Sequence, residues 1–346
     1  MPGVMAADQV AHEDLSDALI LADDRNVTLL PRLRKGPKMA DSPYGWGVEL
    51  PDPRRTAPVP EGIDSYAAEG NQASKLYNRK QKWWREPMVT TEAEELGGRL
   101  GASQQYSGQK AKKIKDQSWD VETTLLSDQD AKEDQFVKDK GEALMGLGRA
   151  INDGVSVGAA GVALTFGDIR TAIPAAYRTP TAQIYTDYLV ASDGVTPIFT
   201  EKKLNDMFRS RHDNMGGTPE LSLFVGTLLK AHISENFGRY EANKTGFTTV
   251  TRLTRTSVND LTRGIDIFKG DNGTVDITQC SFMPFTTRGY ALDMMDVRTR
   301  PLFYLRHTML PYTGAGLKGL IETILGYEFG NPIKHMKIDP KAYAHP

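Results

Sequence analysis

Residues 320–338 read LIETILGYEFGNPIKHMKI, a long strand, a turn and a second strand close to the end of the sequence. Successive side chains of a strand point to opposite faces, and this stretch has two distinct faces. One face is expected to carry Ile321, Thr323, Leu325, Tyr327 and Phe329, and the other Leu320, Glu322, Ile324 and Glu328. A strand in this position usually closes a sheet that opened much earlier. We therefore expect a domain whose other half lies far upstream.

The length and composition indicate a globular chain. Its 346 residues can form two domains of ordinary size, or one domain with large excursions. Mean hydropathy is −0.43, and no apolar run is long enough to span a membrane, so we expect no membrane partner. The first residues lack the basic region of a secretory signal. The net charge of −2 does not indicate nucleic-acid binding by itself.

Residues 31–60 contain seven of the 19 prolines, which predicts extended chain. Residues 44–50 and 84–91 are the two strand-like pieces here, with polar, turn-rich sequence between them. Only twelve large apolar residues occur within residues 38–85, too few for a core. Disordered segments are poor in aromatic residues, yet three of the four tryptophans, Trp46, Trp83 and Trp84, lie within residues 38–85. We therefore expect this segment to be ordered by lying on another molecule.

The same segment carries a basic run in LYNRKQKWWR. It could bind a phosphate backbone, with tryptophans stacking on bases. It could equally dock on an acidic neighbouring subunit, and residues 128–142 of the same chain offer such a surface. The candidate intersubunit contacts are the aromatic and basic residues Trp46, Arg79, Lys80, Lys82, Trp83, Trp84 and Arg85.

Periodic apolar positions predict helices over residues 11–24, 103–126, 129–152, 199–217 and 225–238. In the helix over 199–217, Thr200 is expected to be the N-terminal cap and Gly216 to end the helix. Strands are expected over 246–255 and 290–297, and a hairpin over 264–282 with its turn at Gly270-Asp271-Asn272-Gly273.

Catalytic and metal-binding motifs have structural explanations here. Residues 314–319 match GxGxxG, but a strand follows them where a dinucleotide site needs a helix, so a turn is favoured. Asp271-Asn272-Gly273 lies between strands, which favours a hairpin turn over a calcium loop. The six histidines form no ligand motif, and Cys280 is expected to be a small buried residue. We expect no catalytic residue, cofactor or metal.

The order of these parts resembles the major capsid protein of tailed bacteriophages, with its Hong Kong 97-like α+β fold. EGNQASKLYNRKQKWWREPMVTTEAEE resembles the returning arm of the extended loop, and GQKAKKIKDQSWDVETTLL followed by GEALMGLGRAI the long spine helix and its successor. FTEKKLNDMFRSRHDNMGGTPELSLFVGTLLKAHISEN resembles the helical part of the inserted axial domain. PYTGAGLKGLIETILGYEFGNPIKHMKI resembles the closing strand of the peripheral domain, with a turn at Asn331.

The resemblance implies five parts. Residues 1–40 would be an N-terminal arm, 41–100 the extended loop, 101–175 the peripheral domain with the spine helix, 176–300 the axial domain, and 301–346 the return to the peripheral domain.

The implied function is mechanical. Copies would form hexamers and pentamers of an icosahedral shell around double-stranded DNA, each extended loop lying on a neighbour. The chain would be a component of the virion, assembled in the host cytoplasm. Partners would include a portal, a separate scaffold, if any, and decoration proteins. Two other functions stay open from the residues alone: a nucleic-acid-binding structural protein that uses residues 75–85, and an α+β enzyme without a recognisable motif.

Overall fold

The computed structural model describes residues 25–39, 41–50, 73–89, 105–133, 141–159, 161, 170–192, 194, 196–217, 220–237, 266–311 and 316–341. The helix expected at 11–24 and the strand expected at 246–255 lie outside these residues. The chain divides into two compact units. Unit 1 holds Met1–Asn26, Trp83–Asp120 and Phe303–Thr323; unit 2 holds Val27–Lys82, Val121–Leu302 and Ile324–Pro346. Among the described residues, no helix has the length and apolar character needed to cross a membrane.

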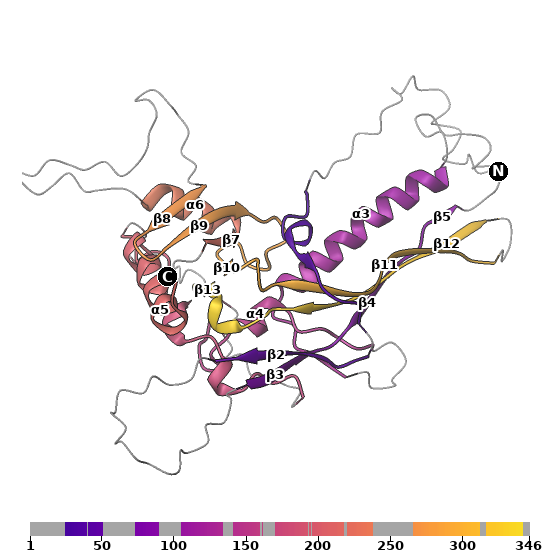
Figure 1. The fold of residues 1–346 in the computed structure, drawn as a ribbon. Coiled ribbons are helices and arrows are strands. Elements are labelled where there is room, and N and C mark those ends of the chain that lie inside the picture. The colour runs from indigo at the N-terminus through magenta and orange to yellow at the C-terminus, as the bar shows by residue number, and fades with distance from the viewer. Residues whose placement is uncertain are drawn as a thin grey trace, which may run out of the picture. The chain divides into compact units, whose positions relative to one another are not determined.

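A six-stranded sheet lies in unit 2, in the order β6-β13-β10-β7-β9-β8. Its strands are β6 (Ile184–Tyr185), β7 (Glu220–Val225), β8 (Ile267–Gly270), β9 (Gly273–Gln279), β10 (Gly289–Leu292) and β13 (Met336–Ile338). Helices α5 (Glu201–Met215) and α6 (Thr227–Asn236) lie beside it (Figure 1). Their apolar side chains share one buried cluster with the sheet, including Phe208 and Ile233 from the helices and Leu223 and Ile277 from the strands.

The local sequence signals of this sheet are confirmed. Thr200 precedes α5, and Gly216 ends it with a φ of 69°, a conformation that glycine adopts without strain. Strands β8 and β9 form the expected hairpin, with Gly270 paired to Gly273 across Asp271-Asn272. Helix α6 ends at Asn236, and Phe237 is its C-cap residue.

A five-stranded sheet has the order β1-β11-β12-β4, and β5 also pairs with β12. Its strands are β1 (Arg34–Lys35), β4 (Gln81–Arg85), β5 (Met88–Val89), β11 (Arg298–Met309) and β12 (Leu317–Glu328). The predicted two-sided strand is confirmed, because the five residues expected on its inner face are at most 1% exposed. Residues 317–319 of the GxGxxG stretch are the first residues of β12, so a strand is present where a dinucleotide site needs a helix.

The long helix α3 (Gln105–Leu126) is confirmed, but the helix expected over 129–152 is wrong in its described part. There Lys132 pairs with Ala143 as an isolated bridge, and only α4 (Leu147–Ala150) is helical. The remaining short helical turns are η1 (Leu30–Arg32), η2 (Ala175–Tyr177), η3 (Thr181–Gln183) and η4 (Pro332–Lys334).

The second strand of the closing pair differs from its expected place. β13 pairs with β10 and β6 of the six-stranded sheet, although the sequence grouped residues 301–346 with 101–175. Asn331 does form the expected turn, because its side chain accepts a hydrogen bond from the Ile333 amide at 3.2 Å. The strand before this turn, β12, therefore belongs to the five-stranded sheet, and the strand after it, β13, belongs to the six-stranded sheet.

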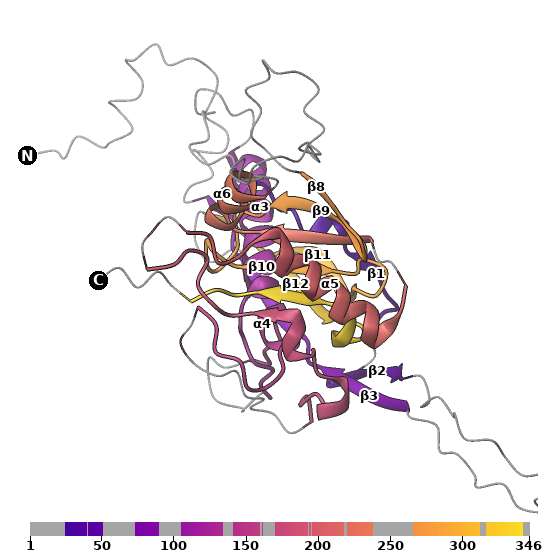
Figure 2. The same cartoon turned by 90° about the vertical axis from the view of Figure 1, so that its left-hand side faces the viewer.

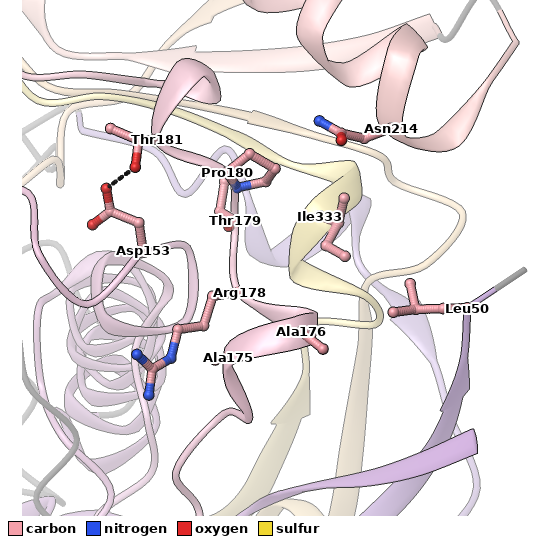
Figure 3. A pocket seen from close by; sticks show the side chains of 10 residues that line it. All are labelled: Leu50, Asp153, Ala175, Ala176, Arg178, Thr179, Pro180, Thr181, Asn214 and Ile333. Atoms are coloured by element: carbon pink, nitrogen blue, oxygen red, sulfur yellow. Dashed lines mark hydrogen bonds between the residues drawn. The ribbon is translucent and has the colours of Figure 1, made fainter. Parts of the chain in front are cut away.

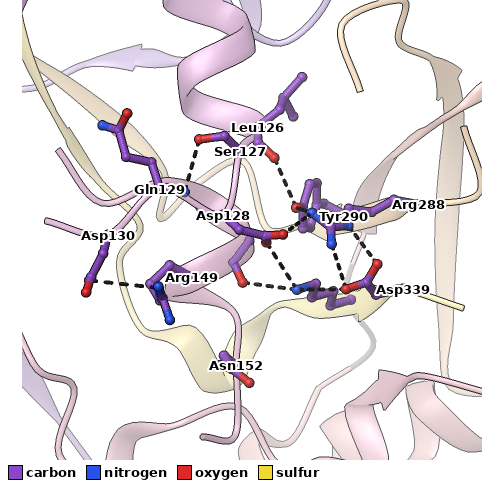
Figure 4. A network of polar contacts seen from close by, with 12 residues as sticks. Leu126, Ser127, Asp128, Gln129, Asp130, Arg149, Asn152, Arg288, Tyr290 and Asp339 are labelled. Atoms are coloured by element: carbon purple, nitrogen blue, oxygen red, sulfur yellow. Dashed lines mark hydrogen bonds and ion pairs between the residues drawn. The ribbon is translucent and has the colours of Figure 1, made fainter. Parts of the chain in front are cut away.

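A buried cluster of charges connects the end of α3 to β10 and to the residues after β13, all in unit 2 (Figure 4). Arg288 donates to both carboxylate oxygens of Asp339 at 2.8 Å and to Asp128 at 2.8 Å. Lys337 donates to the Gly148 carbonyl at 3.0 Å and lies 3.2 Å from Asp339. Two cations thus face two carboxylates in a site where Arg288 is fully buried. Such a cluster is stable only while all its members are paired.

Candidate functional site

The candidate site includes the base of the expected extended loop, residues 41–100. Strands β2 (Tyr44–Glu49) and β3 (Ala73–Asn78) form an antiparallel ribbon in unit 2 (Figures 1 and 2). Its register runs from Tyr44 opposite Asn78 to Glu49 opposite Ala73. Residues 51–72 connect the two strands beyond the last pair and lie outside the described residues. The strand-like piece at 44–50 is confirmed as β2, and its partner is residues 73–78, not the second strand-like piece at 84–91.

Aromatic side chains fix β2 to the closing strand of the same unit. The Tyr44 hydroxyl donates to the Tyr327 carbonyl at 3.0 Å and accepts from the Tyr327 amide at 2.5 Å. Burial raises the pKa of Tyr44 far above its ordinary value, so the hydroxyl stays protonated. The Trp46 indole donates to the Gly330 carbonyl at 2.9 Å and meets the ring of Phe329 edge-on at 4.8 Å. Trp46 is thus an anchor within its own chain.

Strand β3 ends in two polar residues that are also buried. Asn78 donates to the Tyr327 carbonyl at 2.8 Å and accepts from the Met145 amide at 2.7 Å. Arg79 is 1% exposed and lies 3.3 Å from Glu142, which also has Lys80 at 3.6 Å. The acidic partner foreseen within residues 128–142 is therefore found, but in the same chain. The expectation that the whole segment is ordered only on another molecule is wrong for residues 44–49 and 73–85.

In unit 1, one face of the strands contacts the first part of α3. The Tyr106 hydroxyl lies 2.9 Å from His307 Nε2. A Cβ added at Gly319 would lie 2.0 Å from the same Tyr106 hydroxyl. Burial, with a smaller effect of the Lys110 cation, lowers the pKa of His307 and keeps its ring neutral. Arg85 donates to both oxygens of Asp120 on α3 at 2.8 and 2.7 Å. Gly319 and Arg85 therefore mark the helix-facing side of β12 and β4.

The opposite face of these strands carries exposed apolar side chains. Trp84 lies between Trp83 and Arg85 and is 59% exposed. Met88 is 41% exposed and pairs in register with Lys318, which together with Leu320 flanks the helix-facing Gly319. By the alternation of strands, Trp84, Met88, Lys318 and Leu320 share one side of the sheet. We call these four residues the open face of unit 1.

The seven predicted contact residues are divided between the two units. Trp46, Arg79, Lys80 and Lys82 belong to unit 2, whereas Trp83, Trp84 and Arg85 belong to unit 1. Trp83 is buried, with 7% exposed, and its carbonyl accepts from Gln117 of α3 at 3.0 Å. Sequence reasoning missed Met88 and Leu320. The signal that could have found them is their strand alternation relative to Gly319.

A cavity of about 490 Å³ borders Leu50, where β2 ends, in unit 2 (Figure 3). Its one carboxylate, Asp153, accepts from the Val155 and Ser156 amides at 2.9 and 2.7 Å and from the Thr181 hydroxyl at 2.8 Å. Burial alone would raise the pKa of Asp153, but these hydrogen bonds lower it. The carboxylate is thus an acceptor for its own loop and is not placed to act as a general base.

Other residues with potential chemistry have structural roles. Cys280 is buried, its sulfur lies 3.3 Å from Glu122 Oε1, and burial raises its thiol pKa to about 11. Glu122 in turn accepts from the amides of Thr28, Leu29 and Leu30. The described residues contain no group of three or more histidine, cysteine or acidic residues able to hold a metal ion.

Solved structures resemble this fold at low sequence identity. A capsid structure of the cyanophage P-SCSP1u matches with a TM-score of 0.61 at 9% identity, covering 96% of this chain and 94% of that chain. A structure from Gordonia phage Cozz matches at 0.58 and 9%, covering 97% and 93%. The asymmetric unit of the mature capsid of bacteriophage PhiM1 matches at 0.57 and 10%, covering 96% and 92%. These matches confirm the expected α+β, Hong Kong 97-like fold.

A comparison with the sequences of curated proteins found no match. The comparison with protein families matches residues 4–342 to the family described as SU10 major capsid protein. Since that match spans almost the whole chain, the chain belongs to the SU10 major capsid protein family: it is a structural component of the bacteriophage virion that forms the shell of the head, and it is not an enzyme.

Proposed function

We propose that copies of the chain form the hexamers and pentamers of an icosahedral shell that encloses double-stranded DNA. In this shell, residues 51–72 of each copy lie over the open face of unit 1 of a neighbour. The observation that carries the proposal is the β2–β3 ribbon, which is anchored at its base and has its last pair at Glu49 and Ala73. The residues between these strands contain only three large apolar side chains, Val59, Ile63 and Tyr66.

The free energy of ordering residues 51–72 favours their docking on the open face of another copy of the chain. Ordering a chain segment costs roughly 1–2 kcal/mol per residue in backbone entropy, and residues 51–72 have too few apolar side chains to offset this by themselves. A tryptophan offers about 150–250 Å² of surface for burial, and Trp84 is the largest exposed side chain of the open face. Residues 61–69 also contain three acids and no cation, which complements Lys318.

The structure narrows the proposed intersubunit residues. Arg79 and Trp83 are buried within the chain, so we assign them to holding the ribbon and β4 in place. Trp46, Lys80 and Arg85 have contacts within the chain, to Gly330, Glu142 and Asp120. The proposed contact with a neighbour therefore rests on Lys82 and Trp84, and Met88 and Leu320 join it. Of these, Trp84 offers the most apolar surface to a neighbour.

The division into arm, loop, peripheral and axial parts belongs to the same proposal. We take the six-stranded sheet with α5 and α6 as the axial domain that meets its copies around the capsomer axis, with β13 added to residues 176–300. A portal, decoration proteins and, where one is used, a separate scaffold complete the proposed partners. Assembly in the host cytoplasm is proposed with them.

Replacing residues 50–72 by an Asn-Gly turn tests the loop's role. Two-residue turns of this kind close antiparallel strands, and Glu49 and Ala73 are already paired. We expect a folded, soluble subunit whose thermal unfolding is little changed, because all described contacts of β2 and β3 remain. We expect no closed shells by negative-stain electron microscopy, because the proposed contact with the neighbour is gone.

The matched control replaces Arg54 and Arg55 by glutamine at full loop length, which should still give shells. Closed particles of normal size from the shortened variant would contradict the docking role of the loop. A shortened variant with normal circular dichroism but only free subunits supports it.

A further inference from the structure

The parallel pair of β1 and β11 holds several cations in a fixed arrangement within unit 2. Arg34 lies opposite Arg298 in the register, and Lys35 lies opposite Thr299. The Gly36 amide donates to the Thr299 carbonyl at 2.7 Å, and the Thr299 hydroxyl donates to the Arg34 carbonyl at 3.3 Å. Leu33 and Met39 are buried on either side of this stretch. The backbone therefore fixes where these cations stand.

Four of these cations are exposed and lack a carboxylate partner among the described residues. They are Arg34, Lys35, Lys38 and Arg298, and we call them the basic strand pair. The Arg34 guanidinium donates to the sulfur of Met295, at 2.7 Å. Like charges directly opposite on neighbouring strands destabilise the pairing. The arrangement of Arg34 against Arg298 thus costs stability in the free subunit, and an anion would relieve that cost.

Three of the carboxylates near this site already have cationic partners. Asp276 pairs with Arg32 at 3.1 Å, and Asp296 pairs with Lys334 at 2.7 Å. Glu328, which borders the same hollow of about 310 Å³ as Arg298, pairs with Arg300. Of the acids that border this hollow within the described residues, only Glu49 has no cationic partner, so the four cations of the basic strand pair outnumber the acids left to neutralise them.

Protection of a sheet edge does not explain the whole arrangement. β1 is an edge strand, and a lysine or arginine on such a strand discourages pairing with another chain. That role needs charge on β1 alone. It gives no reason for a second arginine directly opposite on β11, which is an inner strand.

We propose that the basic strand pair binds the phosphodiester backbone of duplex DNA, independently of sequence. The inference rests on the proposed function for the polyanion, the DNA that the shell encloses. A guanidinium presents a planar fork of donors that matches a phosphate, and two of the four cations are arginines. Charge alone suffices for such binding, which is salt-dependent. The surface bearing these residues would then face the interior of the shell.

The acidic N-terminal residues of another copy are a less suitable occupant. Residues 1–24 contain six acids and no lysine or arginine, so their charge would fit. They also contain Leu15, Leu19, Ile20 and Leu21, which would need apolar surface to bury. Met295 is the one exposed large apolar side chain that the described residues provide beside Arg34. The site therefore favours a partner that binds through charge only.

The test uses the double variant Arg34→Gln/Arg298→Gln of the full-length, unassembled subunit. Binding to a fluorescent mixed-sequence duplex is measured by anisotropy over a series of salt concentrations. The slope of log affinity against log salt concentration is negative, and losing two phosphate contacts should make it less steep by about 1.8. The control Lys202→Gln/Lys203→Gln removes the same charge from exposed positions on α5 and should leave the slope nearly unchanged.

Folding of the double variant is checked by thermal unfolding without DNA. We expect its melting temperature at low salt to equal or exceed that of the wild type, because the repulsion is removed. An unchanged salt slope in a folded double variant overturns the proposal. So does a result in which a peptide of residues 1–24 binds the wild type but not the double variant, while DNA binds both equally.

Shell formation is scored separately by electron microscopy. Closed shells from a double variant that has lost DNA binding support the inference and leave the proposed function intact. Loss of shells on shortening residues 50–72, with DNA binding retained, concerns the loop alone. The two proposals can therefore fail independently.

Discussion

At the scale of single residues, Asp339 shows how a buried charge can hold distant segments together. It accepts two hydrogen bonds from Arg288 and lies 3.2 Å from Lys337 Nζ. Burial alone would raise the pKa of this carboxyl, but the cations of Lys337 and Arg288 outweigh burial and lower it below the ordinary value of 3.8. A carboxyl with a lowered pKa stabilises the fold above its unfolded pKa and loses this contribution as the pH falls through its folded pKa.

We therefore expect Asp339→Asn to lower the free energy of unfolding near neutral pH by about 3–5 kcal/mol, because Asp128 alone then faces the two buried cations of Arg288 and Lys337. Wild-type stability should decrease steeply below about pH 4, and the variant should show a shallower decrease over the same range. Urea unfolding of the unassembled subunit at several pH values measures both effects.

The control is Asp206→Asn, which removes an exposed carboxylate 3.3 Å from Arg209. Exposed pairs contribute little, so its free energy of unfolding should change by no more than about 1 kcal/mol. An acid dependence of Asp339→Asn equal to that of the wild type would show that this carboxyl is not the group that titrates.

At the scale of single elements, β4 places two tryptophans on opposite faces. Trp83 faces the inside and is 7% exposed, whereas Trp84 is 59% exposed. Trp83→Ala should cost about 3–5 kcal/mol of stability, because it leaves a cavity in the core. Trp84→Ala should change stability by less than about 0.5 kcal/mol and yet reduce the yield of closed shells.

Thermal unfolding of the two single variants, with particle counts by electron microscopy, separates these roles. The account would be wrong if Trp84→Ala assembled like the wild type. It would also be wrong if Trp84→Ala destabilised the free subunit as much as Trp83→Ala.

Elements with strong local signals could be predicted from the sequence. The alternation of β12 predicted its buried face, and Thr200 and Gly216 predicted the ends of α5. The helix expected over 129–152 failed because its glycines serve close packing. A Cβ on Gly146 would lie 2.3 Å from the Ser127 carbonyl, and one on Gly148 would lie 1.9 Å from Asp128. The apolar periodicity that predicts a helix carries no information on these close contacts between the glycines and distant residues.

The candidate site was only partly predictable, since burial depends on distant partners. Nothing local to Arg79 indicates that Glu142 will neutralise it and remove it from the surface. The partner of β2 was also missed, because the register of Tyr44 with Asn78 is set by Tyr327, which both side chains bond. Two residues that the sequence assigned to an intersubunit surface, Arg79 and Trp83, are thus buried within the chain, and the intersubunit role of the segment stays a proposal.

At the scale of the whole molecule, each unit is assembled from segments that are far apart in the sequence. Residues 83–120 and 303–323 share unit 1, and β13 joins a sheet whose other strands precede residue 293. The order of arm, loop, long helix, mixed insert and closing strand was enough to predict the fold class. It was not enough to place β13, because a strand of three residues carries little pattern.

The central claim is that residues 51–72 gain their order from a neighbouring copy. Amide hydrogen exchange of these residues, measured by mass spectrometry in assembled shells and in dilute unassembled subunits, tests it most directly. The account predicts protection in the shell and rapid exchange in the subunit, while β12 is protected in both. Equal protection of residues 51–72 in the dilute subunit, or rapid exchange in intact shells, would contradict it.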